Sequence, residues 1–249
     1  MSGTHGSLAG RRIVLTRSAE DCAAWADELE RLGAVPLVLP CISAEALDTP
    51  ALRAALADAL AAADWLVVTS RRGAEHTAAL LAGAAPPAHV RIAAVGDATA
   101  AAASAAFGRV DLIGAGTAAA LAEAMIGERG VGAGSHVVLA VAENARDVLE
   151  HALAAAGATC TRLAVYRTTP SPPREPKRKL SALGADAIVL ASPTAVTGFL
   201  HQVEMDAPAA IYTIGLTTAE AVRAQGLNVT AAARTPSLAA LLEVIQCGT

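Results

Sequence analysis

The stretch "DWLVVTSRRGAEH", residues 64 to 76, decides the fold, because its apolar run stops at Thr69 and Ser70 and a helical pattern follows. The stretch "DAIVLASPTAVTGF", residues 186 to 199, repeats this arrangement, and its apolar run stops at Ser192. Runs that are apolar at every position are typical of strands buried on both faces of a parallel sheet. Each stretch therefore predicts a buried strand that ends in a small hydroxyl residue and leads into a helix.

The alternation of short apolar runs with alanine- and leucine-rich helical patterns continues along the chain. It predicts an α/β fold in which helices cover both faces of parallel sheets. The strand-like runs are "RIVLTR", "AVPLVLP", "DWLVVTS", "VRIAAVG" and "RVDLIG" in the first half, and "HVVLAV", "TRLAVYRT", "DAIVLAS", "AIYTIG" and "LNVTA" in the second.

The two halves of the chain carry matching glycine and serine positions in the same order. The matching positions are about 120 residues apart, which is too long a period for a solenoid repeat and indicates an internal duplication. A chain of 249 residues is long enough for two similar α/β domains, each with its own core. The matching pairs are Gly33 with Gly157, Ser70 with Ser192, and Gly96 with Gly215.

Composition excludes several classes of function. The net charge is −4, and no basic block interleaved with aromatic residues occurs, so we expect no nucleic-acid partner. No apolar run reaches the roughly 18 residues of a membrane span, and the N-terminus lacks the apolar core of a signal peptide. We therefore expect no membrane contact and a cytoplasmic protein. The four cysteines and six histidines show no metal-ligand spacing, so we expect no metal, no disulfide and no cofactor.

The candidate binding residues all follow predicted strands. In an open parallel sheet, ligands bind beyond the carboxyl ends of the strands, where helix N-termini present N–H groups that suit anions. The hydroxyl residues there can equally be plain helix caps, and the arginines can equally be exposed loop residues without a ligand. The candidates are Arg17, Thr69, Ser70, Arg71, Gly96, Thr99, Arg146, Ser192, Gly215 and Thr218.

Tyr166 and the stretch "GAGTAAA" each allow a functional and a purely structural interpretation. Tyr166, in "LAVYRTT", lies at the apparent crossing between the domains, where its phenol could donate a proton or could merely pack against a domain edge. The stretch "GAGTAAA" mimics a dinucleotide fingerprint, but its counterpart "AAARTPSLAA" has no glycines, so nucleotide binding is disfavoured. No pattern for a nucleophile, a metalloprotease or a phosphate-binding loop is present.

Taken together, these segments resemble the uroporphyrinogen-III synthase family. The resemblance implies two similar parallel-sheet domains, flavodoxin-like and related by duplication, joined by a two-stranded connector made of "AVPLVLP" and "LAVYRTT". Domain one would be residues 1–35 plus 171–249, and domain two would be residues 36–170. The segments that carry the resemblance are "IVLTR", "LERLGAVPLVLP", "DWLVVTS", "AAVGDATA", "LAAAGATCTRLAVYRT", "DAIVLASPTAV", "YTIGLTTAEAVRAQG" and "PSLAALLEVI".

The resemblance also implies a function. The family's enzymes are cofactor-free dehydrating cyclases, which are lyases that close hydroxymethylbilane with inversion of its terminal pyrrole ring. Tyr166 matches the tyrosine suggested to assist departure of the substrate's hydroxyl, Thr99 and Thr218 match cleft threonines, and Ser70 and Ser192 match strand-end serines. A transient handover of the bilane from the preceding enzyme is a further expected partnership. The sequence departs from the family pattern at Ala191, where threonine is common, and at the paired arginines of "TSRRGAEH".

Two other functions remain open from the sequence. One is a noncatalytic module of the same fold that senses a small anion or a tetrapyrrole, as in a regulator. The other is a two-domain binding protein for some other small anion. No DNA-binding segment and no export signal are evident, and this favours the enzyme.

Overall fold

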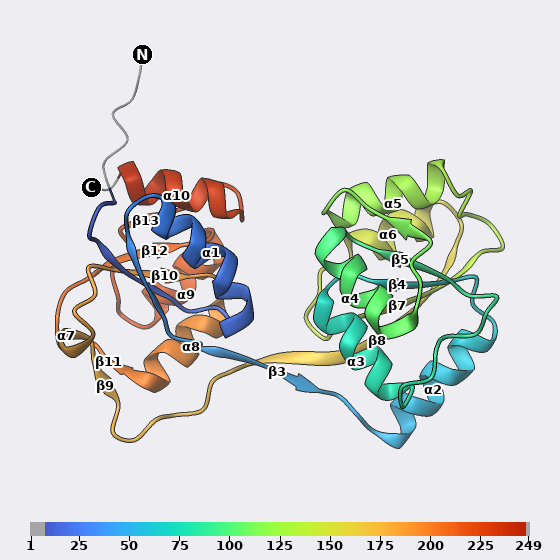
Figure 1. Cartoon of the computed structure of the whole chain (residues 1–249), viewed down its shortest axis with the longest axis horizontal. Coiled ribbons are helices and arrows are strands. Elements are labelled where there is room, and N and C mark those ends of the chain that lie inside the picture. The colour runs from blue at the N-terminus through green and yellow to red at the C-terminus, as the bar shows by residue number, and fades with distance from the viewer. Residues whose placement is uncertain (1–7, 248–249) are drawn as a thin grey trace, which may run out of the picture. The chain divides into compact units, whose positions relative to one another are not determined.

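The computed structural model describes residues 8 to 247, which form two compact units. Unit 1 contains the described residues up to Ser43 together with those from Thr169 onward, and unit 2 is Ala44–Thr168. Each unit is an α/β structure with helices on both faces of its sheet (Figure 1). No helix among the described residues is long and apolar enough to cross a membrane.

Unit 1 is built on a five-stranded parallel sheet. Residues alternate between two core clusters along each strand: Ile13 and Leu15 pack under one pair of helices, while Val14 packs under the other helices. The strand order is β2 (Val35–Val38), β1 (Arg12–Leu15), β10 (Ala187–Leu190), β12 (Ala210–Thr213) and β13 (Ala231–Ala232). Helices α1 (Ala19–Arg31) and α10 (Leu238–Cys247) contribute to one cluster, and α7 (Leu180–Leu183), α8 (Pro193–Gln202) and α9 (Leu216–Ala224) contribute to the other. The short strands β9 (Arg178–Lys179) and β11 (Val203–Glu204) pair with each other.

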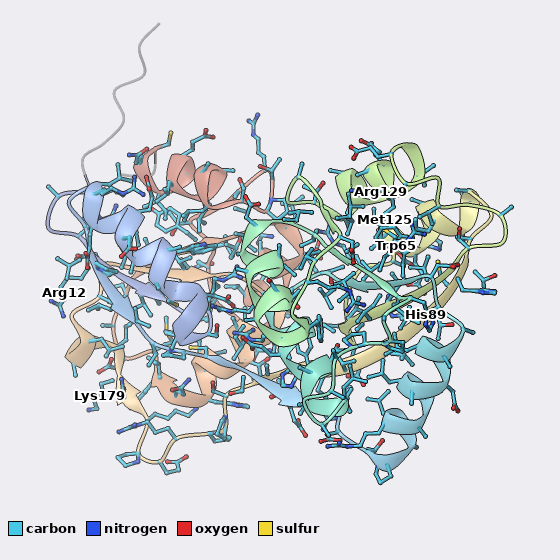
Figure 2. The ribbon with its side chains drawn as sticks, turned by 45° about the vertical axis from the view of Figure 1, so that its right-hand side comes forward. Arg12, Trp65, His89, Met125, Arg129 and Lys179 are labelled. Carbon is cyan, nitrogen blue, oxygen red and sulfur yellow. The ribbon has the colours of Figure 1, made fainter. Side chains whose placement is uncertain are left out.

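Unit 2 repeats this plan with a six-stranded sheet. Trp65, at the start of β4, and Met125 of α5 are fully buried in the same cluster, and Figure 2 labels both. The strand order is β3 (Ile42–Ala46), β8 (Thr159–Pro170), β7 (His136–Ala142), β4 (Trp65–Val68), β5 (Arg91–Ala94) and β6 (Leu112–Ile113). Helices α2 (Pro50–Ala61), α3 (Arg71–Leu80) and α4 (Asp97–Phe107) contribute to one cluster, and α5 (Ala118–Gly127) and α6 (Val148–Ala155) contribute to the other.

The two sheets have the same topology. Unit 1 reads β2-β1-β10-β12-β13, which is the flavodoxin order 2-1-3-4-5 in chain order. Unit 2 contains β8-β7-β4-β5-β6, the same order with the chain entering at its third strand. The matching pairs of the sequence fall at equivalent places, since Ser70 follows β4 as Ser192 follows β10, and Gly96 follows β5 as Gly215 follows β12. The parallel α/β prediction is confirmed, while the duplication itself stays a prediction.

The expected connector was wrong in one of its two strands. The segment "AVPLVLP" does not join the units, because Val35–Val38 pairs with β1 and forms the edge strand of the unit 1 sheet. A strand, a crossing helix and a parallel return strand form a standard unit, and β1, α1 and β2 are one. The chain instead leaves unit 1 through β3, a less apolar segment whose partner is β8, the strand that carries the chain back.

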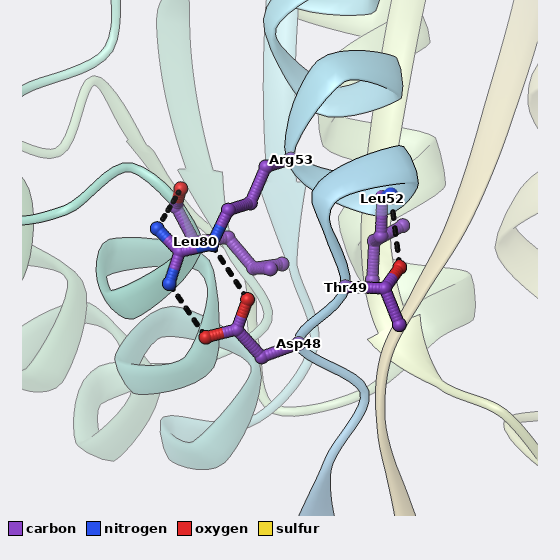
Figure 3. Close-up of polar contacts among 5 residues, drawn as sticks. All are labelled: Asp48, Thr49, Leu52, Arg53 and Leu80. Carbon is purple, nitrogen blue, oxygen red and sulfur yellow. Dashed lines mark hydrogen bonds and ion pairs between the residues drawn. The ribbon is translucent and has the colours of Figure 1, made fainter.

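Helix α3 is held at its C-terminal end by the neighbouring helix α2, as Figure 3 shows. The guanidinium of Arg53 donates two hydrogen bonds of 2.6 Å to the carboxylate of Asp48 and one of 3.4 Å to the carbonyl of Leu80, the last residue of α3. The Thr49 hydroxyl caps the start of α2 by accepting from the Leu52 N–H at 3.1 Å. These contacts fix the position of α3, whose N-cap is Ser70.

Candidate active site

The switch point of the unit 2 sheet lies between β4 and β7, where the strand order reverses. In open α/β sheets, the crevice outside the carboxyl ends at this point is the usual ligand site. A cavity of about 140 Å³ lies there, lined among others by Thr69 after β4, Val141 at the end of β7, Ala118 at the start of α5 and Arg146 in the loop after β7. Two of the residues expected from the sequence, Thr69 and Arg146, therefore line one cavity within unit 2.

Two arginines border this cavity and differ in their pairing. Arg162 of β8 donates a 2.8 Å hydrogen bond to the carboxylate of Glu150 and another of 2.8 Å to the carbonyl of Ala145. Its charge is therefore balanced within the protein. Arg146 is exposed and makes no ion pair or hydrogen bond with the other described residues. Arg146 is thus the guanidinium available to an anionic ligand at this cavity.

Ser70 links the start of α3 to the predicted catalytic tyrosine. Its Oγ caps the helix by accepting from the Gly73 N–H at 2.9 Å, and it also lies 3.1 Å from the hydroxyl of Tyr166. The plain capping role that the sequence left open is therefore present, and it coexists with a contact to the phenol. Tyr166 is 7% exposed, so this hydroxyl pair lies largely out of bulk water. Arg71 is the exposed first residue of the same helix.

A β-bulge orients Tyr166 toward α3. Strand β8 pairs with β7 in regular register up to Ala164 opposite Val141, but the next pair is Tyr166 opposite Ala142, so Val165 has no partner on β7. In a regular strand Tyr166 would face away from Val165. Both side chains instead belong to the core cluster on the α3 side of the sheet. The extra residue therefore brings the phenol to the face from which Ser70 can reach it.

The corresponding switch point of unit 1 lies between β10 and β1. Ser192 follows β10 and caps α8, its Oγ accepting from the Ala195 N–H at 3.1 Å. Arg17 follows β1, lies 4.8 Å from the centre of the Trp25 ring and forms a 3.6 Å ion pair with Asp21. The buried Nε of Arg17 has no hydrogen-bond partner among the described residues. Ring stacking and the ion pair hold this guanidinium in place at the carboxyl end of β1.

A glycine and a threonine follow β5 in unit 2 and β12 in unit 1, and the surroundings of the two glycines differ. A Cβ on Gly96 would lie 3.0 Å from Cα of Gly116, so glycine is needed there for two loops to approach, whereas a Cβ on Gly215 would meet open space. Thr99 and Thr218 lie in the first turns of α4 and α9, 7% and 3% exposed. Neither threonine hydroxyl makes a hydrogen bond with another described residue, so each can turn toward a ligand. Gly116 belongs to "GAGTAAA", whose glycines serve this loop packing.

Sequence reasoning missed His76 as a site residue, although it lies inside the stretch that decides the fold. Its imidazole stacks on the Tyr166 ring, with 5.3 Å between the ring centroids and 26° between the planes. Burial lowers the pKa of His76 below its ordinary 6.5; Glu75 opposes this shift and Arg72 adds to it. A histidine six residues after a strand-end serine carries no sequence signal of its own, because the stack depends on the bulge in β8.

The described residues define a class of two-unit α/β proteins with hydroxyl and N–H groups at the switch point of each sheet. Among them, no group of three His, Cys, Asp or Glu side chains is placed to hold a metal ion. The model of the family described as uroporphyrinogen-III synthase HemD matches residues 23–243 of the chain. The chain belongs to the uroporphyrinogen-III synthase family, whose members are enzymes of tetrapyrrole biosynthesis.

Solved structures agree on the fold. The chain resembles a uroporphyrinogen-III synthetase from Helicobacter pylori with a TM-score of 0.57 and 17% identity, over 96% of this chain and 99% of that one. It resembles a mutant uroporphyrinogen III synthase from the bacterium Thermus thermophilus with a TM-score of 0.53 and 21% identity, over 96% of this chain and 98% of that one. No curated protein sequence matches the chain significantly. The fold and family expected from the sequence are confirmed.

Proposed function

We propose that the chain is a lyase that cyclises hydroxymethylbilane with loss of water and inversion of the terminal pyrrole ring. The observation that carries this proposal is the hydroxyl pair of Tyr166 and Ser70, 3.1 Å apart and largely buried, beside the switch point of the unit 2 sheet. A phenol held by a hydroxyl is suited to general acid catalysis at a departing hydroxyl group.

The reaction begins at the hydroxymethyl carbon of the substrate. As its C–O bond breaks, the phenol proton of Tyr166 joins the departing hydroxyl to form water, and an azafulvene cation remains. The substituted α carbon of the terminal pyrrole attacks this cation and gives a spiro intermediate. Fragmentation and closure at the free α carbon invert the ring, and the proton released from that carbon restores the phenol.

The substrate carries acetate and propionate groups, so its orientation depends on anion binding. Arg146 and Thr69 line the unit 2 cavity. Ser192 and Arg17 lie at the switch point of unit 1, and Thr218 follows the neighbouring strand. Selecting one closure geometry tenfold over another takes about 1.4 kcal/mol, so control of the isomer needs several oriented contacts. Backbone N–H groups at the helix starts supply further donors.

The experiment is an assay of hydroxymethylbilane conversion in which the type III and type I products are separated after oxidation. We expect type III uroporphyrinogen from the wild type. Tyr166→Phe should lower kcat about a hundredfold or more while the thermal unfolding curve is kept. Formation of the type I isomer alone, at the spontaneous rate, would exclude the proposed reaction and favour the sensing or binding alternatives.

The second tyrosine provides a matched control. Tyr212 is fully buried in the core of unit 1, and its hydroxyl has no hydrogen-bond partner among the described residues. Tyr212→Phe should keep full activity, because it removes the same atom from a core position that belongs to neither switch point. It should also leave stability unchanged or raise it by about 1 kcal/mol, since a buried hydroxyl without a partner is destabilising.

The proposal includes a transient handover of the bilane from the preceding enzyme and a cytoplasmic location. The bilane closes spontaneously to the type I isomer, so direct handover from the enzyme that makes it would protect the product pattern. Coupled assays test this, because an added trap for free bilane should not reduce type III product if handover occurs. A cytoplasmic location is tested by cell fractionation.

A further inference from the structure

Helix α3 contacts Tyr166 at two separate points. At its N-cap, Ser70 Oγ lies 3.1 Å from the phenol oxygen, and about one and two-thirds turns later the His76 imidazole stacks on the phenol ring. The first contact holds the end of the side chain and the second covers the face of its ring. A tyrosine side chain has two rotatable bonds, so these two contacts together determine where its hydroxyl points.

The position of α3 is itself fixed from both ends. Ser70 caps its first turn, and the Arg53 guanidinium binds the carbonyl of its last residue, Leu80. The Thr77 hydroxyl, next to His76 and fully buried, donates to the Gly73 carbonyl at 2.6 Å. His76 is therefore carried on a rigid element, and its ring cannot move from Tyr166 without a rotamer change.

We propose that His76 is a positioning residue for Tyr166: its imidazole, stacked on the phenol, keeps the phenol oxygen beside Ser70 with its proton directed to the substrate. This inference rests on the role proposed for Tyr166. The residue acts through Tyr166 and has no proton-transfer step of its own.

The hydrogen-bond directions support this arrangement. Ser70 Oγ accepts from the Gly73 N–H at 2.9 Å, and a hydroxyl that accepts one hydrogen bond becomes a better donor of another. When Ser70 donates to the phenol oxygen, the phenol proton is left for the departing hydroxyl of the substrate. If the ring rotated away, Tyr166 would lose this donor and its proton would lose its direction.

The uncharged state of the imidazole favours stacking. Burial lowers the pKa of His76 and so favours the neutral ring, which lies on Tyr166 as an aromatic plane. A phenyl ring can make the same contact, whereas an aliphatic side chain of similar size cannot. This difference separates a stacking role from mere filling of space.

The test compares three substitutions at this position. His76→Ala and His76→Leu should lower kcat on the order of tenfold with little change in KM, because the phenol is misplaced after substrate is bound. His76→Phe should keep most of the wild-type kcat. His89→Ala is the control, since His89 is exposed at the amino end of β5 and is labelled in Figure 2. Equal kcat in wild type, His76→Ala and His76→Leu would overturn the inference.

A double-mutant cycle connects the effect to the phenol hydroxyl. In the Tyr166→Phe background, His76→Ala should cause no further loss of kcat, because there is no proton left to direct. An equal loss in both backgrounds would overturn the inference by showing that His76 acts elsewhere. If Tyr166→Phe is itself fully active, the role of Tyr166 and this inference both fail, while a type III product leaves the proposed reaction in place.

A readout independent of activity uses the two tyrosines of the chain. With tyrosine rings labelled for NMR and assigned through Tyr212→Phe, His76→Leu should shift the ring signals of Tyr166 and leave those of Tyr212 unchanged. His76→Phe should keep a ring-current shift at Tyr166. Unchanged Tyr166 signals in folded His76→Leu would overturn the stack.

Discussion

Gly198 of α8 lies so close to the chain at Cys41 that a Cβ atom on it would overlap the Cys41 carbonyl oxygen and lie 2.8 Å from the carbonyl carbon. It would also lie 3.0 Å from the amide nitrogen of Ser171, which itself donates to the Cys41 carbonyl at 2.8 Å. Helix α8 thus packs directly on the backbone of unit 1 at the two places where the chain leaves for β3 and returns from β8.

Polar contacts from the end of α8 reinforce this packing. The Gln202 amide donates to the Pro40 carbonyl at 2.8 Å, and the His201 Nδ1 lies 2.9 Å from the Ser171 carbonyl. The Ser171 hydroxyl also donates to the Pro40 carbonyl, at 3.2 Å. The last turn of α8 therefore fixes the chain to unit 1 at Pro40, just before β3, and at Ser171, just after β8.

Gly198→Ala should destabilise the protein by about 2–3 kcal/mol, because backbone atoms must move to admit the methyl group. Gly127→Ala is the matched control: Gly127 ends α5, and a Cβ there meets nothing within 4 Å. This control should be neutral or stabilising by up to about 1 kcal/mol, as alanine favours helix over glycine. Chemical unfolding measures both, and equal stability of the two variants would contradict the packing of α8 on Cys41.

The four cysteines should react with iodoacetamide in the order of their exposure and thiolate content. Burial raises the pKa of Cys41 to about 12 and raises that of Cys22, while Cys247 is exposed. At pH 8 the Cys41 thiolate fraction is on the order of one in ten thousand. Mass spectrometry of the native protein should find Cys247 labelled first and Cys41 and Cys22 protected.

The control for this labelling is the protein in denaturant, where all four thiols should react alike. Cys160 should react after Cys247, since partial burial raises its pKa. If Cys41 in the native protein were labelled as fast as Cys247, the segment around Cys41 that precedes β3 would not be protected by packing.

Arg146→Ala should raise KM about tenfold with a smaller change in kcat. A charge-assisted hydrogen bond contributes roughly 1.5–3 kcal/mol, and a substrate carboxylate keeps this contact before and during the reaction. Steady-state kinetics on hydroxymethylbilane measures the effect. Arg31→Ala is the control, because Arg31 ends α1 and pairs with Glu28 away from the carboxyl ends of the strands. An unchanged KM for Arg146→Ala would remove this arginine from the site.

Asp48→Asn should lower Tm slightly at neutral pH, by about 1–2 °C, as expected for an exposed pair. The hydrogen bonds from Arg53 hold the pKa of Asp48 below its ordinary 3.8. A depressed carboxyl pKa stabilises the fold above the ordinary value, and this contribution is lost as the pH falls through the lowered one. The Tm difference between variant and wild type should therefore vanish on acidification below that window.

Asp58→Asn is the control for this pair, since Asp58 is exposed on α2, the helix that carries Arg53, and makes no ion pair with a described residue. It should leave Tm unchanged at every pH. A Tm difference for Asp48→Asn that persists in strong acid would mean that the carboxylate is not the group that Arg53 holds.

The strands and the residues at their carboxyl ends could be predicted from the sequence, because both depend on local patterns. Uniformly apolar runs identified β4 and β10, and Ser70 and Ser192 cap the following helices as a strand-end serine can. The expected domain boundaries and ligand contacts stay predictions.

The connector was misassigned because an apolar run does not specify its partner. Val35–Val38 and Ile42–Ala46 are both extended, and pairing with β1 rather than β8 is a tertiary choice. The stack of His76 on Tyr166 could not be predicted either, because it requires the bulge at Val165, which has no partner on β7, to turn the phenol to the α3 side. A β-bulge does not produce a recognisable hydrophobic pattern, so its position cannot be predicted from the sequence.

The sheet of unit 1 takes β1 and β2 from the beginning of the chain and β10, β12 and β13 from its end, whereas unit 2 is continuous. During translation, the middle of the chain can complete its sheet as soon as Thr168 has left the ribosome. The first two strands must wait for about sixty further residues before β13 completes the sheet to which they belong. The order of synthesis therefore makes unit 2 the earlier structure, although β1 and β2 of unit 1 are synthesised before it.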